Sequence, residues 1–273
     1  MSMDTGRINF DLLQDDDKPS LSYTKPQPLN PSLQAFAAAN SLKYTAFSAY
    51  IGQEKSTMIN NPYYSARIHP TIIDMVEGQL KGLNYRLFKF SFLESQGMHN
   101  RWRHDCQMIA VDLPRQVPHI SLTPRRMKDR ALVLSHRFNP GQELDFDPEI
   151  NAVFKIESPA ATEQLARQLF TLPVQRAVKQ YAADYAIEFI DDRLYIFAPL
   201  FTGTKQEYQR LYACTGAILE VLLPVLQSLP ATTGNLPHLK QYEFWRNNAV
   251  GFIIIAAVFV VALVVVAIVT SRS

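Results

Sequence analysis

The chain has 273 residues, of which 47% are hydrophobic and 19% charged, and its formal net charge is +2 at pH 7. A net charge so close to zero argues against a polyanionic partner for the chain as a whole, and two cysteines exclude a scaffold built on disulfides. Without its polar first residues and its apolar last ones, the chain keeps roughly 200 residues, enough for one well-packed domain or two small ones.

Residues 1–30 are polar, with Asp15, Asp16 and Asp17 in a row and prolines at 19, 26 and 28. They lack the apolar mass that offsets the entropy of ordering, so we expect a disordered N-terminal tail. They also contain no apolar core of a secretory signal peptide. A helix should begin at Asn30-Pro31, where Asn can cap and Pro can fill the first helical position.

A polar, irregular stretch is expected next, and a β-rich region begins near Thr71. "TIIDMVEGQ" and "LNYRLFKFSFLE" are strand-like runs separated by "LKG", which predicts a hairpin. Phe88, Phe90 and Phe92 alternate along the second run, so they should share one buried face. Further strands are predicted for "CQMIAVDL", "PHISL", "RALVLSH" and "NAVFKIE", with prolines at 114, 118 and 124 separating them.

Helical spacing replaces strand spacing at Ser158-Pro159, where Ser should cap a helix and Pro should open it. A second helix is predicted from Pro173, and "YAIEFI" and "RLYIFAP" follow as two strands joined by an Asp191-Asp192 turn. Thr204 and Glu207 match a capping box. The helix that they open has an apolar stripe, and Pro224 should end or kink it.

This order of elements predicts an α+β domain over residues 31–226, a mixed, mostly antiparallel sheet with flanking helices. Residues 227–245 would be a linker with an interfacial segment. A single transmembrane helix over 246–270 follows, because the uncharged stretch Ala249–Val269 is long enough to span a bilayer as a helix. Residues 271–273 form a short tail, and the aromatic belt with its flanking cation would be Tyr242, Phe244, Trp245 and Arg246.

An anchor at the C-terminal end, without a signal peptide, predicts a tail-anchored, single-pass protein with its N-terminal domain in the cytosol. Lys240 and Arg246 precede the span and only Arg272 follows it, which favours the same orientation. We expect the cytoplasmic membrane. The span contains no ionisable residue and no GxxxG pattern, so it should neither relay protons nor drive helix pairing.

"MHNRWRHDC" offers the side chains His99, His104 and Asp105 as weak candidate metal ligands beside Cys106. Their spacing matches no zinc pattern, and the alternative is a polar loop between two strands. Asp145 and Asp147 could also bind a divalent cation, although charged residues on an edge strand are the simpler interpretation. A metal-assisted hydrolase on one of these two sets is the alternative to a non-enzymatic protein. No cofactor is predicted.

Residues 99–137 contain eight Lys and Arg against three Asp, and residues 143–163 contain six acids against one lysine. The basic segment Arg101–Arg137 could contact anionic lipid or a protein partner, or it could be a solvated face that pairs with the acidic stretch. No nucleic-acid partner is expected, because no module signature or stacking platform is present. The candidate contact residues are Arg101, Trp102, Arg103, Arg125, Arg126 and Lys128.

Signatures of common enzyme classes are missing from the sequence. It contains no GxSxG, HExxH or GxGxxG, and no Gly-rich phosphate loop. No sustained heptads lead into the apolar stretch, which argues against a SNARE-type fusion protein. The sequence alone therefore favours a binding or scaffold module at a membrane over an enzyme.

Several segments resemble a group of bacterial membrane-anchored proteins of unknown function. They are "LQAFAAANSLKY", "VEGQLKGLNYRLFKFSF", "AVDLPRQVPHISL", "FKIESPAATEQLARQLFTLPVQRAV" and "IEFIDDRLYIFAP", all within residues 33–198. Such proteins often place glycine where this chain has Ser41. The resemblance implies a bacterial α+β domain next to the cytoplasmic membrane, and it implies no catalytic residues.

We therefore expect a membrane-inserted, non-enzymatic module with a protein partner. The identity of that partner and the oligomeric state stay open at this point. An anionic-lipid-binding domain that uses Arg101–Arg137 is the second alternative to this expectation.

Overall fold

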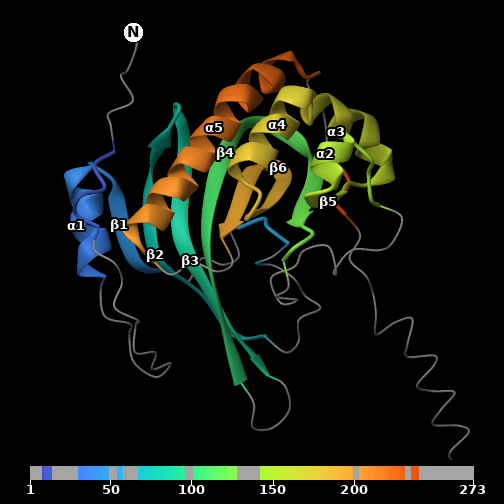
Figure 1. Ribbon diagram of the computed structural model, residues 1–273. Helices are drawn as coiled ribbons and strands as arrows, with labels where there is room; N and C mark the ends of the chain where they lie inside the picture. The colour runs from blue at the N-terminus through green and yellow to red at the C-terminus, as the bar shows by residue number, and fades with distance from the viewer. Residues whose placement is uncertain are drawn as a thin grey trace, which may run out of the picture. The chain divides into compact units, whose positions relative to one another are not determined.

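In the computed structural model, six strands form one antiparallel sheet, and helices pack against one of its faces (Figure 1). The predicted α+β class with a mostly antiparallel sheet and flanking helices is confirmed. The structure describes residues 8–13, 30–48, 54–57, 59, 67–95, 101–127, 142–198, 203–230 and 235–239, with the backbone alone for 47–48, 67–70, 93–95 and 101–104. The strands are β1 (Lys43–Ser48), β2 (Arg67–Leu80), β3 (Leu83–Ser95), β4 (Arg101–Pro124), β5 (Phe154–Glu157) and β6 (Ala186–Ala198); the helices are α1 (Pro31–Ala39), α2 (Pro148–Asn151), the 3-10 turn η3 (Ala160–Thr162), α3 (Glu163–Leu169), α4 (Leu172–Tyr181) and α5 (Lys205–Ser228).

Strand β4 is the centre of the sheet. Along its first half it pairs with β3 on one side and with β6 on the other, so that Gln107 lies opposite both Lys89 and Ala198. Near its end β5 replaces β3, so that Ser121 lies opposite both Glu157 and Glu188. Residues of β5, β4 and β6 therefore lie side by side in one row across this end of the sheet.

The β2–β3 hairpin is confirmed. Its two-residue turn is Lys81-Gly82, and both residues have positive φ, 53° and 78°. That backbone twist matches the twist of the two paired strands, and glycine adopts it without steric cost. Phe88, Phe90 and Phe92 are fully buried on one face, as their alternation predicts.

Strand β1 was not predicted, because the stretch after α1 reads as irregular. It pairs with β2, and Lys43 and Glu77 form an ion pair at 2.6 Å across the two strands. The predicted start of α1 is confirmed, since the Asn30 side chain accepts a hydrogen bond from the Leu33 amide. Between α1 and β1, Ser41 has a φ of 56°, a left-handed conformation that favours glycine.

The two strands expected on either side of Pro114 are parts of the single strand β4, which also begins earlier than expected, at Arg101. The prolines are tolerated because the register with β6 shifts twice, between Asp112 and Val117 and again before Ile120. At such bulges the backbone amide is not needed for the ladder, so a residue without an N–H can be accommodated. The predicted strand "RALVLSH" lies outside the described residues.

The predicted hairpin at Asp191-Asp192 is wrong. Residues Ala186–Ala198 form the one strand β6, and the chain bends at Asp191, where φ is 53°, instead of reversing. This bend falls opposite the register shifts of β4, so both strands deform at the same place. An Asp pair predicts a turn because aspartate tolerates left-handed φ, and here that tolerance serves a kink in a continuous strand.

Two other local predictions are corrected. The hydroxyl of Ser158 caps no helix but donates to the carbonyl of His119 at 2.9 Å, and the first turn after it is the 3-10 turn η3. Asp145 and Asp147 do not lie on an edge strand: Asp147 is the N-cap of α2, where its carboxylate accepts from the Glu149 amide. Nearby, Glu143 forms a bridge opposite Glu157 of β5, and the Leu144 amide donates to the Ile156 carbonyl at 2.8 Å.

Helix α5 has the predicted capping box, in which Thr204 and Glu207 each bond the other's backbone. Its predicted apolar stripe is buried, but the helix runs through Pro224 to Ser228 instead of ending at the proline. By length and composition α5 could cross a membrane, a test that the core helix of a soluble domain also passes. Its stripe belongs to the same core cluster as the strands beneath it.

Part of the expected N-terminal tail contributes to the core. The side chain of Leu13 is buried, and the ring of Phe10 lies 5.4 Å from the rings of both Phe36 and Tyr212. A single aromatic residue thereby connects residues 8–13 with α1 and α5. The expectation of a disordered tail over 1–30 therefore does not hold for these six residues.

The sheet has two buried faces. The helix face packs against α1, α3, α4 and α5, whose buried residues share a core cluster with Leu87, Val111 and Ile196. On the second face, the Phe88–Phe92 row clusters with Met108, Phe197 and two residues from short segments, Ile59 and Leu239. Segment 54–57 with Ile59 and segment 235–239 therefore cover the second face.

The predicted transmembrane helix over 246–270 and its aromatic belt, Tyr242, Phe244, Trp245 and Arg246, lie outside the described residues. They belong to a unit, Gln241–Ser273, that is separate from the unit Met1–Lys240.

Candidate functional site

The second face carries a buried pair of ionisable side chains, His119 of β4 and Glu188 of β6. Residues alternate between the faces of a strand, so the neighbours Ile187 and Phe189 lie in the core of the helix face. Both His119 and Glu188 are 0% exposed, and His119 Nε2 lies 2.9 Å from Glu188 Oε1. A buried charge is costly unless hydrogen bonds satisfy it, so the surrounding donors define what this pair can do.

Segment 54–57 supplies three of those donors. The Ser56 hydroxyl donates to Glu188 Oε2 at 2.7 Å, and Thr57 donates through both its hydroxyl, at 2.5 Å, and its amide, at 3.1 Å. Burial by itself would raise the pKa of Glu188, but His119, Thr57 and Ser56 together hold that pKa below its usual value. Glu188 is therefore a carboxylate that anchors segment 54–57 to the sheet.

Segment 235–239 is attached through the other side of the His119 ring. The amide of Leu239 donates to His119 Nδ1 at 3.0 Å. An imidazole nitrogen that accepts a hydrogen bond carries no proton, so the ring proton sits on Nε2 and is donated to Glu188. These contacts identify His119 as a neutral imidazole with both nitrogens engaged.

A second polar cluster adjoins this pair on the same face. The buried carboxylate of Glu54 accepts from Arg86 at 3.0 Å, from Arg193 at 3.1 Å and from the Tyr195 hydroxyl at 2.8 Å. Arg86 also pairs with Asp112 at 3.1 Å. Burial and the Glu54 carboxylate raise the pKa of Tyr195 well above its usual value. The cluster balances its own charges, which is the arrangement of a structural network.

Charged side chains also join segments 54–57 and 235–239 to β6 at its bend. Lys55 lies 2.8 Å from Asp192 and 3.5 Å from Asp191, and His238 Nε2 lies 2.8 Å from the same Asp191. Partial burial of Asp192 opposes ionisation, but Lys55 holds the pKa of that carboxyl below its usual value. The strand bend at Asp191 thus presents one carboxylate to both covering segments.

In the row that contains Glu188, two buried polar atoms have no hydrogen-bond partner among the described residues. They are Ser121 Oγ and Glu157 Oε2, on residues that face each other across β4 and β5. Burial raises the pKa of Glu157, although Lys155 pairs with its other oxygen at 2.8 Å. Glu157 is therefore a destabilising group when it is ionised.

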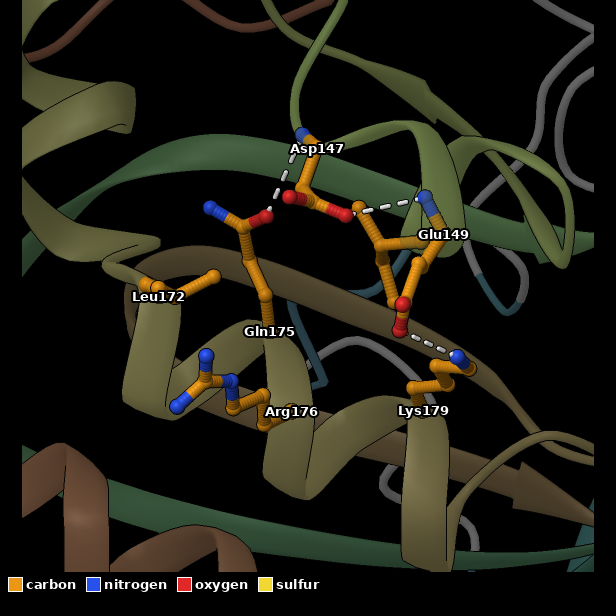
Figure 2. A pocket seen from close by; sticks show the side chains of 7 residues that line it. Asp147, Glu149, Leu172, Gln175, Arg176 and Lys179 are labelled. Carbon is orange, nitrogen blue, oxygen red and sulfur yellow. Dashed lines mark hydrogen bonds and ion pairs between the residues drawn. The ribbon is translucent and has the colours of Figure 1, made fainter.

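A hollow of about 80 Å³ lies between α2 and α4, and Figure 2 shows the side chains that line it. The Asp147 amide donates to Gln175 at 3.4 Å, Lys179 pairs with Glu149 at 2.6 Å, and Arg176 and Leu172 complete the wall. A hollow of this size accommodates a few water molecules or one small polar group. One carboxylate–cation pair, Glu149 with Lys179, lies inside it, and the Asp147 carboxylate caps α2.

The predicted metal ligands are placed only in part. His99 lies outside the described residues, while His104 and Asp105 are consecutive residues of β4 and not part of a loop. Of Asp145 and Asp147, the second caps α2 with its carboxylate. Within the described ranges, no three His, Cys, Asp or Glu side chains come together in a way that could hold a metal ion.

The structure describes five of the six predicted contact residues of the basic segment, and these five lie in two different parts of the chain. Arg101, Trp102 and Arg103 belong to the first part of β4, and Lys128 lies outside the described residues. Arg125 pairs with Glu143 at 2.8 Å, which is a pairing of the basic segment with the acidic stretch, and Arg126 pairs with Asp184.

The His119–Glu188 pair was missed by sequence reasoning. The signal available was a histidine in "PHISL" and a glutamate in "IEFI", each at an inward position of a strand-like run. Such a polar residue in an apolar pattern indicates a buried, satisfied group, but the pattern does not say which residues satisfy it.

No family model and no curated protein matches the chain. Among solved structures, the crystal structure of the mycobacterial trehalose monomycolate transport factor A, TtfA, is similar, with a TM-score of 0.50. The alignment has 11% identity and covers 74% of this chain and 96% of that chain. At this identity the likeness shows a shared fold.

Proposed function

We propose that this chain is a non-enzymatic binding or scaffold module that the apolar segment Ala249–Val269 holds close to a membrane. The observation that carries the proposal is the docking of residues 235–239 on the second face, through Leu239 and His238. These residues lead directly into the sequence that is apolar enough to span a bilayer.

The docking of residues 235–239 shortens the stretch of chain between the domain and the apolar segment, which we call the tether. Ala249 follows Leu239 by ten residues, and ten extended residues reach at most about 35 Å. A linker counted from the end of α5 at Ser228 would be about twice as long. The docked segment therefore limits the domain to the layer next to the bilayer, where a binding module meets membrane proteins and lipid headgroups.

The fold comparison supports an accessory role rather than an enzymatic one. TtfA is named as a transport factor for trehalose monomycolate. A domain of this fold can thus serve a transport process. By analogy, we propose that the partner of this chain is a protein of the same membrane.

The first part of β4 is where we place the partner contact. Strands β3 and β4 run on beyond the layer of helices (Figure 1), and Arg101, Trp102 and Arg103 belong to this extension. Arginine and tryptophan are enriched among residues that carry binding energy in protein interfaces. In contrast, Arg125 and Arg126 already have acidic partners in the domain.

The attachment is tested with the full chain in its native membrane. We expect resistance to alkaline extraction and full digestion of the domain by protease added to cytosol-out vesicles. Replacing Val258 and Val261 by Asp should release the protein, because each charge at the centre of a span costs about 3 kcal/mol. A domain protected in cytosol-out vesicles, or a Val258→Asp/Val261→Asp variant that stays in the membrane, would refute the attachment.

The partner contact is tested by photo-crosslinking from position 102, with position 180 on α4 as the control, because Gln180 is exposed at the surface of the domain. We expect a discrete adduct with a membrane protein from position 102 only. The Arg101→Glu/Arg103→Glu variant should weaken this adduct. Equal adducts from both positions, or adducts with lipid alone, would contradict a specific protein partner.

A further inference from the structure

We propose that His119 is a pH-sensitive latch: as a neutral imidazole it fastens residues 235–239 to the sheet, and on protonation it releases them. The latch rests on geometry, since the one ring joins the Leu239 amide through Nδ1 and Glu188 through Nε2. As far as it concerns the tether, the inference deepens the function proposed above.

The proton balance of the latch follows from the two hydrogen bonds. Nε2 already carries a proton, so a second proton can bind only at Nδ1. There it would face the N–H of Leu239, and a favourable contact would become a contact between two donors. A protonated His119 would still pair with the Glu188 carboxylate, so protonation breaks the contact with segment 235–239 and keeps the contact with β6.

The charged groups around His119 either favour its protonation or do not oppose it. From β6, Glu188 favours the charged imidazole, and from segment 54–57 only the neutral groups of Ser56 and Thr57 reach Glu188. From segment 235–239, the His238 ring stands edge-on to His119 with centroids 5.6 Å apart. Two protonated rings at that distance would repel each other.

One contact of the segment responds in the opposite direction. His238 pairs with Asp191, which Lys55 also approaches, and protonation of His238 strengthens an ion pair with a carboxylate. This pair lies at the surface, with the His238 side chain 49% exposed, where ion pairs contribute little. The His119 contact is fully buried, so its loss decides the net sign.

Release would lengthen the tether. With Leu239 free, the chain before the apolar segment starts at Pro230, and Ala249 follows Pro230 by 19 residues. The reach rises from about 35 Å to about 65 Å. When His119 is protonated and the segment is released, the domain reaches partners farther from the bilayer.

The test is the hydrogen exchange of the Leu239 amide in the full chain, labelled with ¹⁵N-leucine in detergent micelles. Protection is expressed relative to an unstructured peptide at the same pH. We expect it to fall at least about tenfold between pH 8 and pH 5. In ¹⁵N-histidine spectra, His119 should be the Nε2–H tautomer at pH 8 and doubly protonated at pH 5.

Two substitutions of His119 separate its two contacts. In His119→Asn the amide oxygen takes the place of Nδ1, so Leu239 should stay protected at every pH. In His119→Gln the amide nitrogen takes the place of Nε2, so the bond to Glu188 persists and Leu239 protection should be low at every pH. The control His238→Gln should retain the pH-dependent loss.

Protection in the wild type that does not change with pH would overturn the latch. So would a loss that disappears in His238→Gln, because the exposed histidine would then be the sensor. The exchange measurement does not depend on the bilayer, so it can fail while the attachment holds. If membrane attachment fails in the vesicle assays, a pH-dependent Leu239 amide would still establish the latch.

Discussion

At the scale of single residues, the buried polar groups of the second face differ in how well they are satisfied. Glu188 accepts hydrogen bonds from His119, Ser56 and Thr57, whereas one carboxylate oxygen of the equally buried Glu157 has no partner. The pKa of Glu188 is lowered and that of Glu157 is raised. The two glutamates therefore contribute to stability with opposite dependence on pH.

A raised pKa in the folded state means that the contribution of Glu157 is complete below the pKa of the unfolded chain, about 4.3. That contribution is lost as the pH rises through the folded value. We predict that Glu157→Gln raises the free energy of unfolding by about 1 kcal/mol at pH 8 and has a smaller effect at pH 4. Urea unfolding of the full chain in detergent, followed by circular dichroism, measures both values.

The matched control for Glu157→Gln is Glu143→Gln, because Glu143 lies opposite Glu157 but is exposed and pairs only with Arg125 among the interactions described here. Exposed ion pairs contribute about 0–1 kcal/mol, so Glu143→Gln should lower stability slightly or leave it unchanged. A Glu157→Gln variant that is less stable than wild type at pH 8 would show that the pair with Lys155 outweighs the burial of the charge.

The left-handed backbone of Ser41 explains why glycine is expected at this position. Related-looking sequences often have glycine at this place, and Ser41 has a φ of 56°. We predict that Ser41→Gly stabilises the protein by up to about 1 kcal/mol, because relief of left-handed strain outweighs the added freedom of the unfolded chain. Thermal unfolding measures the change. Ser41→Ala is the control and should not stabilise, since alanine keeps the strain.

At the scale of elements, three signals confined to a few neighbouring residues were predicted correctly, whereas the predicted helix cap at Ser158 was wrong. The Asn30 cap, the Lys81-Gly82 turn and the Thr204 capping box each depend on residues within one turn of chain. Elements that depend on a distant partner were predicted wrongly. In the sequence, the prolines of β4 and the Asp pair of β6 indicate the ends of strands. The pairing of β4 with β6 shows instead that both strands continue and that their irregular positions lie opposite each other.

The capping box of α5 should contribute measurably to the stability of the protein. Thr204→Ala removes the side-chain acceptor of the Glu207 amide and should lower the free energy of unfolding by about 1 kcal/mol. Thr204→Ser keeps the acceptor and should be nearly neutral. The measurement is urea unfolding at pH 7, and equal losses in both variants would show that the methyl group, not the cap, stabilises the helix start.

At the scale of the whole molecule, segments far apart in sequence are joined at the two faces of the sheet. On the helix face, Phe10 contacts both α1 and α5 through Phe36 and Tyr212. On the second face, Glu188 and His119 bind segments 54–57 and 235–239. The chain before α1 and the chain after α5 are therefore both part of the domain, and the latter leads into the predicted membrane span.

We predict that Phe10→Ala lowers the free energy of unfolding by about 2 kcal/mol, since a partly buried aromatic side chain loses less than the 3–5 kcal/mol or so of a fully buried one. Leu12 lies in the same segment but is 45% exposed, so Leu12→Ala should change stability by less than about 0.5 kcal/mol. Urea unfolding compares the two. Equal effects would contradict the assignment of residues 8–13 to the core.

The sequence by itself determined the α+β class, the β2–β3 hairpin, the caps of α1 and α5, the buried faces of β3 and α5, and the prediction of a membrane span. All of these follow from periodicity or from contacts between near neighbours in the chain. The tertiary structure alone decided the continuity of β4 and β6 and the meeting of His119 with Glu188, 69 residues away, and with Leu239, 120 residues away. Hydrogen bonds over such separations exist only after the sheet has formed, and no local pattern in the sequence specifies which strands pair.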